Sequence, residues 1–279
     1  MSISKTILIT GATSGIGKEA ALELARQGNE VIFTTRNIET AEAIKAEFDA
    51  QKKDDHGSLD FIFCNLSSFE SVVKACNSFL ETHHQLDILI NNAGVWNFEP
   101  KVSINKIEET FHVNVLSPSL LKSLLLPAME KSGDARIIQT ASALHYGNID
   151  FDNMEGKKKF SGFNAYRQSK LSIILLTRWW AKSLQEKQIG VYALHPGLVN
   201  TKLGRNAGWF ANLFFKFIGI SPKKGAQTII FLSSESQKDL ISGEYYTKNK
   251  VKKITGESYD LATAERLDIV VNQYIYEYL

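Results

Sequence analysis

Residues 6–17 read TILITGATSGIG, and this stretch decides the fold. A short apolar run is followed at once by a glycine-rich turn, and Ile16–Gln27 then has the composition of a helix that ends at Gly28. Glycines permit a tight turn and let the backbone approach a pyrophosphate, which is then held at the helix N-terminus. The glycine spacing is G-x-x-x-G-x-G and not G-x-G-x-x-G, and any strand–helix turn can hold glycines, so this stretch needs support from the rest of the chain.

The same alternation of strand and helix continues along the chain. Further strands are expected at 30–35, 59–64, 86–91, 135–141, 191–195 and 244–247, and further helices at 39–51, 69–84, 106–131 and 165–187. The apolar runs lack polar alternation, which indicates strands covered on both faces. The pattern predicts the α/β class, with a doubly wound Rossmann-type domain whose mostly parallel seven-stranded sheet lies between helices. No linker, repeat or composition break interrupts the sequence, so we expect one domain over residues 1–279.

Composition excludes several classes of protein. The 32 Lys and Arg against 30 Asp and Glu leave a net charge of +2, which gives no basic footprint for nucleic acid. Cys64 and Cys76 cannot form a disulfide framework, and no Cys/His cluster suggests a metal, so a reducing, cytoplasmic location is expected. No apolar run approaches the about 20 residues of a membrane span, and the N-terminal run is too short for a signal peptide. Peripheral contact with a membrane stays open.

Three further motifs follow the glycine-rich turn in order. Asn91-Asn92-Ala93-Gly94 ends the fourth apolar run, Ser142 follows the fifth, and Tyr166 and Lys170 form Y-x-x-x-K in a helix. With these motifs the chain resembles the short-chain dehydrogenase/reductase family nearly from end to end, because FHVN at 111–114 and PGLV at 196–199 also fit. Within the family it is most similar to the retinol dehydrogenase and WW-domain oxidoreductase branch, on residues 15–23, 141–147 and 242–246. The resemblance implies a nucleotide-binding half at about 1–135 and a catalytic and substrate-lid half at about 136–279.

The Ser, Tyr and Lys side chains point to acid–base chemistry. Tyr166 and Lys170 are four residues apart, so they share one helix face. A free tyrosine has a pKa of about 10, and a nearby ammonium lowers it, so we expect Lys170 to lower the pKa of Tyr166. Ser142 can donate to the substrate oxygen. The resemblance adds Asn114, which would link Lys170 to water in a proton relay; the alternatives for Asn114 are a helix cap or a buried amide.

Cofactor contacts are expected along the same motifs. They comprise Gly11, Thr13, Ser14, Gly15, Ile16, Gly17, Arg36, Asn37, Asn65, Leu66, Asn92, Ala93, Gly94, Tyr166, Lys170, Pro196, Gly197, Val199 and Thr201. An acidic residue after the second strand would bind a ribose 2′-hydroxyl and repel a 2′-phosphate. No Asp or Glu follows the second strand directly, and the planar guanidinium of Arg36 can bind a phosphate there. We therefore expect a preference for NADP(H), with NAD(H) also usable; the alternative is a solvated Arg36. Asn65 stands where relatives usually carry Asp, which weakens the expected adenine contact.

The substrate is expected at Ser142, Tyr166 and His145, although a satisfied loop histidine explains His145 equally well. The resemblance places a substrate lid at Leu203–Ile220, where Trp209 and Phe210 favour a lipophilic alcohol, aldehyde or ketone of retinoid, steroid or fatty type. An ordinary packed helix or a membrane contact are the alternatives for this stretch. Relatives often pair through their two long helices, here about 106–131 and 165–187, so a homo-oligomer is expected from the resemblance alone.

Together these features predict an NADP(H)-dependent oxidoreductase that acts on CH–OH donors through Asn114, Ser142, Tyr166 and Lys170. The alternative is a nucleotide-binding regulatory or interaction protein built on the same fold. A degraded set of catalytic residues would favour that alternative, but all four residues are present.

Overall fold

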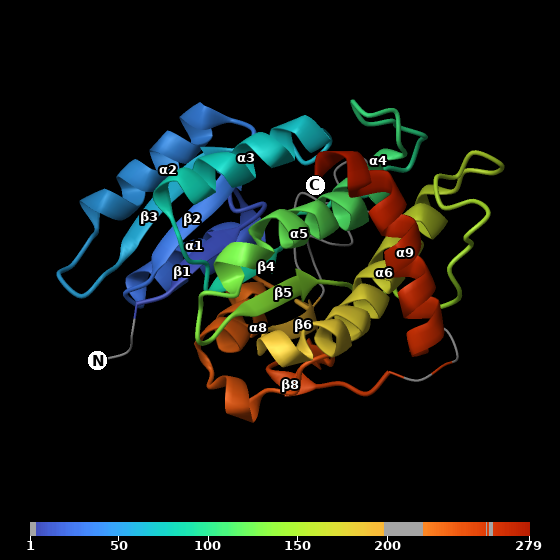
Figure 1. Ribbon diagram of the computed structural model, residues 1–279. Helices are drawn as coiled ribbons and strands as arrows, with labels where there is room; N and C mark the ends of the chain where they lie inside the picture. The colour runs from blue at the N-terminus through green and yellow to red at the C-terminus, as the bar shows by residue number, and fades with distance from the viewer. Residues whose placement is uncertain (1–3, 198–219, 255, 257–258) are drawn as a thin grey trace.

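The structure is a computed structural model that describes residues 4–254, 256 and 259–279, except for 198–219. Among these residues, one sheet runs through the centre of the molecule and helices cover both of its faces (Figure 1). The strand order is β3-β2-β1-β4-β5-β6-β7-β8, and all pairs are parallel except β7 with β8. The strands are β1 Thr6–Ile9, β2 Glu30–Thr35, β3 Ser58–Phe63, β4 Ile88–Asn91, β5 Arg136–Thr140, β6 Gly190–His195, β7 Tyr245–Thr247 and β8 Lys250–Val251.

The expected fold class is confirmed, with one strand more than the expected seven. The additional strand β8 is two residues long and pairs antiparallel with β7. Lys248 and Asn249 turn the chain between the two strands, with φ values of 50° and 62°. Both residues of β8 are exposed, so no apolar run marked the strand in the sequence.

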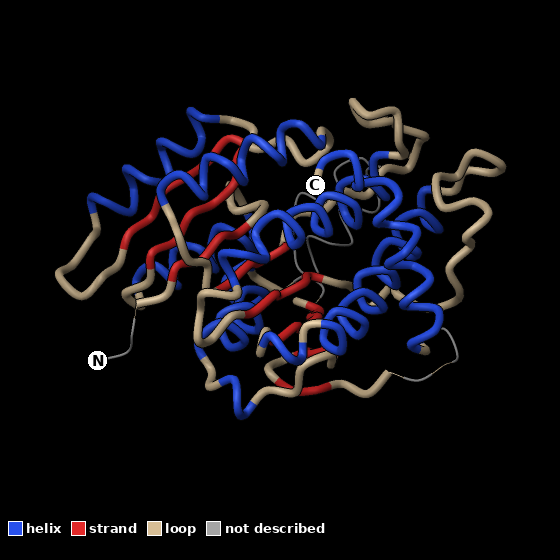
Figure 2. The backbone as a smooth tube through the Cα atoms, in the orientation of Figure 1, coloured by secondary structure: helices blue, strands red, loops and turns tan. Residues whose placement is uncertain are grey.

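Helices lie on both faces of the sheet (Figure 2), and an apolar core lies between the sheet and the helices on each face. Helices α1, α2 and α8 pack on one face, and α3, α5, α6 and α9 pack on the other. Side chains of β1 alternate between the two cores: Ile7 and Ile9 enter the first, and Leu8 the second. The helical elements are α1 Gly15–Arg26, α2 Ile38–Ala50, α3 Phe69–Thr82, α4 Glu109–Phe111, η1 His112–Leu116, α5 Ser117–Met129, α6 Gly162–Ser183, η2 Gln185–Lys187, α8 Pro222–Ser234, η4 Gln237–Asp239, α9 Leu261–Ile275 and η6 Tyr276–Tyr278.

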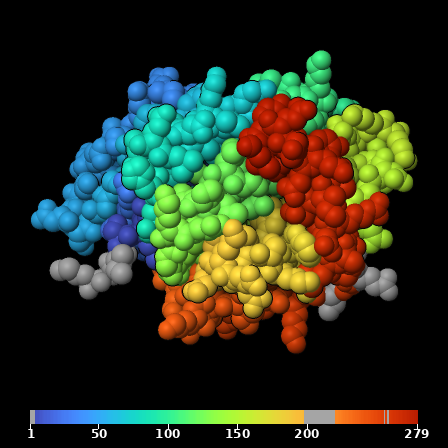
Figure 3. Space-filling model, in the orientation of Figure 1, coloured from blue at the N-terminus to red at the C-terminus, as the bar shows by residue number. Residues whose placement is uncertain are grey.

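Helix α9 lies across α6 and α5 on the outside of the second core (Figure 3). Leu267 and Val271 of α9 are fully buried there, and Trp180 Nε1 of α6 donates to Asp268 Oδ1 at 2.7 Å. Lys122 of α5 lies over the Trp180 ring, 4.8 Å from its centroid. The two helices expected to pair between copies therefore already share a partner within the chain, and any such pairing must use a face that α9 leaves open.

A buried arginine ties the sheet to α8. Arg136 at the start of β5 is 1% exposed and makes a bidentate pair with Asp134. Its Nη1 also donates to the carbonyl oxygens of Leu232 and Glu235, at 2.8 and 2.6 Å. Since β5 ends just before Ser142, this anchor helps to fix the strand that carries a candidate catalytic residue.

Candidate active site

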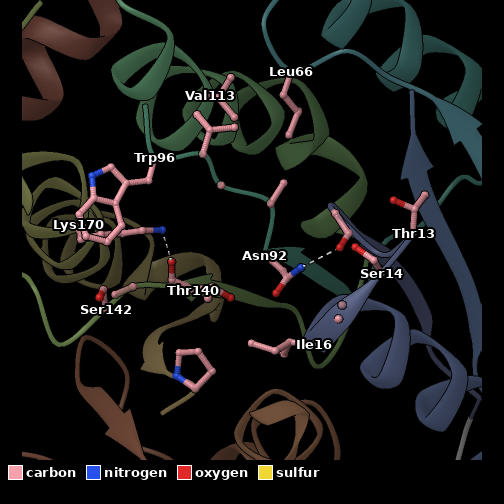
Figure 4. A pocket seen from close by; sticks show the side chains of 18 of the residues that line it. Thr13, Ser14, Ile16, Leu66, Asn92, Trp96, Val113, Thr140, Ser142 and Lys170 are labelled. Carbon is pink, nitrogen blue, oxygen red and sulfur yellow. Dashed lines mark hydrogen bonds between the residues drawn. The ribbon is translucent and has the colours of Figure 1, made fainter. Parts of the chain in front are cut away.

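A cavity of about 820 Å³ opens at the carboxyl ends of the parallel strands. The order of strands reverses between β1 and β4, which is the place where open α/β sheets bind ligands. Figure 4 shows Thr13, Ser14 and Ile16 of the glycine-rich turn on one side of the cavity. Ser142 and Lys170 lie on the other side, with Asn92 between the two groups. One continuous space thus connects the expected nucleotide turn with the expected catalytic residues.

Two glycines of the glycine-rich turn, Gly11 and Gly17, have no room for a side chain. Gly11 and Gly15 have φ values of 71° and 61°, which favour glycine. A Cβ at Gly17 would lie 2.3 Å from the Gly11 carbonyl oxygen and 2.5 Å from Asn92 Nδ2. Asn92 Nδ2 donates to the carbonyl oxygens of Thr10 and Gly11, at 3.0 and 3.1 Å, and so ties the turn to β4. Helix α1 begins at Gly15 without a side-chain cap, so its first N–H groups are available to an anion, and the turn fits a pyrophosphate.

The residues expected to contact the rest of a nucleotide divide into two groups. Arg36 is exposed and lines the cavity, and Asn65 and Leu66 line it as well. Asn37 does not line it, because its side chain caps α2 by accepting from Thr40 N at 2.9 Å. The expected cofactor contact of the Asn37 side chain is therefore not supported by this geometry.

Tyr166, Lys170 and Ser142 meet at the other end of the cavity. Lys170 is 3% exposed, and its Nζ donates to the Thr140 carbonyl oxygen at 2.9 Å and lies 5.5 Å from the centroid of the Tyr166 ring. Burial raises the pKa of Tyr166, and a hydrogen bond with Ser142 lowers it by less. Burial also lowers the pKa of Lys170 to about 8.

The expected lowering of the Tyr166 pKa is thus absent, because the loss of water around the phenol outweighs the favourable contacts. Tyr166 consequently keeps its proton at neutral pH, which suits a general acid.

Asn114 holds the loop that follows β4. It lies in the π-helical turn η1 and is 1% exposed. Its Oδ1 accepts from Val95 N at 2.8 Å, while its Nδ2 donates to the Val95 carbonyl oxygen at 2.9 Å and to Ser169 Oγ at 3.0 Å. A Cβ at Gly94 would lie 3.3 Å from both Asn114 Oδ1 and Lys170 Nζ. Gly94 therefore keeps open the space between these two polar groups, as a relay would require.

His145 lies behind Ser142 and does not line the cavity. Its Nδ1 is 2.5 Å from the Ser142 carbonyl oxygen, and its ring packs edge-on against Tyr245 and Tyr259. Burial lowers its pKa. This geometry agrees with a satisfied loop histidine that supports Ser142 and not with the expected substrate contact.

The other expected residues fall into two sets. Ala93, Gly94, Pro196 and Gly197 line the cavity as expected. Val199, Thr201, Trp209 and Phe210 lie outside the described residues, as does nearly all of the expected lid Leu203–Ile220.

Several lining residues were not expected from the sequence. They include Cys64, Trp96, Glu109, Val113, Leu144, His195 and Pro222. Trp96 follows Gly94 by two residues, so the motif that marks the end of β4 could have drawn attention to it. Glu109 lies two residues before the FHVN stretch at 111–114, and its carboxylate accepts from Asn97 and pairs with Lys101.

Two features are absent from the part of the chain that the structure describes. No group of three or more His, Cys, Asp or Glu side chains is arranged to hold a metal ion there. No helix in the same part combines the length and apolar character needed to cross a membrane.

Comparisons with known proteins agree with this geometry. Residues 5–209 match the family model of the short chain dehydrogenases. The chain is 35% identical over 273 residues to retinol dehydrogenase 13 of Homo sapiens, an alignment that covers 94% of this chain and 82% of that protein. A solved protein of Mycobacterium paratuberculosis superimposes with a TM-score of 0.77 at 25% identity, covering 96% of this chain and 92% of that one. A metagenomic short-chain oxidoreductase in complex with NADP gives a TM-score of 0.67 at 25% identity, covering 87% of this chain and 96% of that one.

Proposed function

We infer the function from one premise: the chain belongs to the short-chain dehydrogenase/reductase family and is an NAD(P)-dependent oxidoreductase. On that premise we propose an enzyme that prefers NADP(H) and interconverts a lipophilic alcohol and its aldehyde or ketone. One observation carries the proposal. The cavity that begins at the glycine-rich turn ends at Ser142, Tyr166 and Lys170, so a bound dinucleotide and a carbonyl group would meet there.

Each polar side chain has a defined task in the proposed reaction. The nicotinamide cofactor, when bound, gives or takes the hydride. In the reducing direction Tyr166 donates its phenolic proton to the carbonyl oxygen, and Ser142 donates a hydrogen bond to the same oxygen. In the oxidising direction Tyr166 takes the proton from the alcohol. Lys170 restores the proton of Tyr166, and Asn114 holds the loop that faces them. Burial raises the pKa of the Tyr166 phenol, so at neutral pH Tyr166 holds the proton that the reducing direction requires.

Arg36 supports the preference for NADP(H). It lies at the rim of the cavity after β2, and no carboxylate stands among residues 34–37 to repel a 2′-phosphate. The guanidinium is planar and carries a permanent charge, so it can bind a phosphate with two parallel hydrogen bonds. The solved relative that holds NADP is consistent with this choice.

The walls of the catalytic end support a lipophilic substrate. Trp96, Val113 and Leu144 line the cavity with apolar side chains. Such a lining favours an apolar body, with a few polar groups to orient the carbonyl. The name of the curated relative, retinol dehydrogenase, is consistent with the same class of substrate.

The experiment is to measure NADPH and NADH oxidation by the purified protein over a panel of aldehydes and ketones. Tyr166→Phe is the matched control, because it removes the hydroxyl and keeps the ring. We expect turnover with NADPH on long-chain or ring-bearing carbonyls, poor turnover of small polar ketones, and a loss of at least about 10²-fold in the control. NADPH binding without turnover of any carbonyl would contradict the proposal and favour a regulatory nucleotide-binding protein.

A further inference from the structure

One aromatic side chain at the catalytic end has no part in the proton chemistry. Trp96 lines the cavity, and its ring stacks on the Tyr166 ring with centroids 4.4 Å apart and planes 11° apart. In Figure 4 the indole lies on the same side of the cavity as Lys170 and Ser142. A substrate whose carbonyl oxygen reaches the Tyr166 hydroxyl must therefore place the groups next to that carbonyl alongside the indole.

Two other aromatic rings, those of Phe98 and Phe163, pack against the indole. Trp96 also stacks on Phe98, with centroids 5.0 Å apart and planes 22° apart, and Phe163 of α6 lies 6.3 Å away. Trp96 Nε1 is buried and has no hydrogen-bond partner among the described residues. The ring is consequently positioned by packing and not by a polar anchor, so its shape decides how much room remains beside Tyr166.

The backbone that carries the indole is fixed as well. Asn114 binds both the N–H and the carbonyl oxygen of the preceding residue, Val95. A little further along the loop, a Cβ on Gly162 would lie 2.2 Å from the Asn97 carbonyl oxygen, so the loop and the start of α6 are in direct contact. The wall formed by Trp96 thus cannot move back without disturbing both η1 and α6.

From this geometry we propose that Trp96 determines specificity by limiting the width of the substrate beside the reacting carbon. The enzyme then discriminates against carbonyl compounds that are branched at the neighbouring carbon. This inference rests on the proposed function, since it concerns the substrate of the same site. A packed apolar wall distinguishes one methyl group by about 10- to 200-fold, which sets the size of the effect.

The test uses pairs of aldehydes of equal composition, one linear and one with two methyl groups on the carbon next to the carbonyl. The quantity measured is the ratio of kcat/KM for the branched over the linear isomer, with NADPH saturating. Differences in intrinsic reactivity between the isomers cancel when this ratio is compared between enzyme variants. Trp96→Ala removes the wall, and Trp96→Phe keeps a smaller stacked ring. Trp179→Phe is the matched control, because Trp179 lies on α6 where its ring contacts Lys182 and does not line the cavity.

We expect the ratio to rise at least about tenfold in Trp96→Ala, to rise less in Trp96→Phe, and to stay unchanged in Trp179→Phe. An unchanged ratio in a folded Trp96→Ala enzyme that still binds NADPH would overturn the inference and leave the proposed function intact. If Trp96→Ala does not fold, an unchanged ratio in Trp96→Phe overturns the inference in the same way. If the wild-type protein turns over neither isomer nor any other carbonyl, the proposed function fails first, and this inference fails with it.

Discussion

Replacing Lys170 with Met should stabilise the cofactor-free protein while it abolishes activity. Burial lowers the pKa of the Lys170 ammonium from 10.5 to about 8 in the folded chain. Each unit is worth about 1.4 kcal/mol, so the charge costs the folded state about 3 kcal/mol at pH 7, where both states carry the proton. Met is apolar and of similar length, so it removes that cost, although it also loses the hydrogen bond to the Thr140 carbonyl oxygen.

The stability difference between Lys170→Met and wild type should depend on pH. Between about pH 8 and 10.5 the unfolded chain binds the Lys170 proton more tightly than the folded chain does, so this residue makes stability rise with pH. The stability advantage of Lys170→Met should therefore shrink by about 2 kcal/mol between pH 7 and pH 9.5. The assay is urea unfolding of both proteins at both pH values, with Lys74→Met as control because Lys74 is exposed on α3. An advantage that does not change with pH, or a variant that is less stable at pH 7, would refute the reasoning.

Three further outcomes follow from the same geometry. Arg36→Asp should lower the ratio of kcat/KM for NADPH over NADH by at least about tenfold, since it replaces a phosphate-binding fork with a repelling carboxylate; an unchanged ratio would contradict the assignment of Arg36. Gly94→Ala should lower kcat at saturating NADPH by about tenfold with little change in Tm, because its Cβ would lie 3.3 Å from both Asn114 Oδ1 and Lys170 Nζ; full activity would show that this space is not needed. Arg136→Ala should destabilise the chain by about 3 kcal/mol or more in urea unfolding, because it removes a buried cation and its hydrogen bonds to two carbonyl oxygens, while Asp134 keeps its ion pair with Lys5; a loss below about 1 kcal/mol, the value of one ordinary hydrogen bond, would count against that anchor.

Most of the parallel sheet could be predicted because its signals are local. Each of the strands β1 to β6 overlaps a short stretch rich in apolar residues, and the glycines after β1 indicate a tight turn there. Strand β8 was not predicted, because its two exposed residues show no apolar pattern. Their pairing with β7 also depends on a turn with positive φ values, which the sequence does not reveal. The packing of α9 on α6 could not be predicted from the sequence either, because Trp180 and Asp268 are brought together only in the folded chain.

The candidate site could be predicted where a motif is short and continuous. Tyr166 and Lys170 lie four residues apart on one helix, so the sequence alone places them on one face. The direction of the Tyr166 pKa could not be predicted in the same way, because the sequence shows the neighbouring charge but not the burial that outweighs it. For His145 the sequence left a substrate contact and a satisfied loop histidine both open, and the tertiary structure places the side chain behind Ser142. Trp96 was not expected at the site, because only the tertiary structure brings its ring onto Tyr166.

The central claim is that this one cavity transfers a hydride with Tyr166 as the proton donor. The most direct measurement is to supply NADPH deuterated at the transferred position together with a lipophilic aldehyde, and to analyse the alcohol by mass spectrometry. The account predicts that wild-type protein yields alcohol carrying the deuterium at the former carbonyl carbon, and that Tyr166→Phe yields essentially none while it still binds NADPH. Wild-type protein that binds NADPH but forms no labelled alcohol, or Tyr166→Phe that forms as much as wild type, would contradict it.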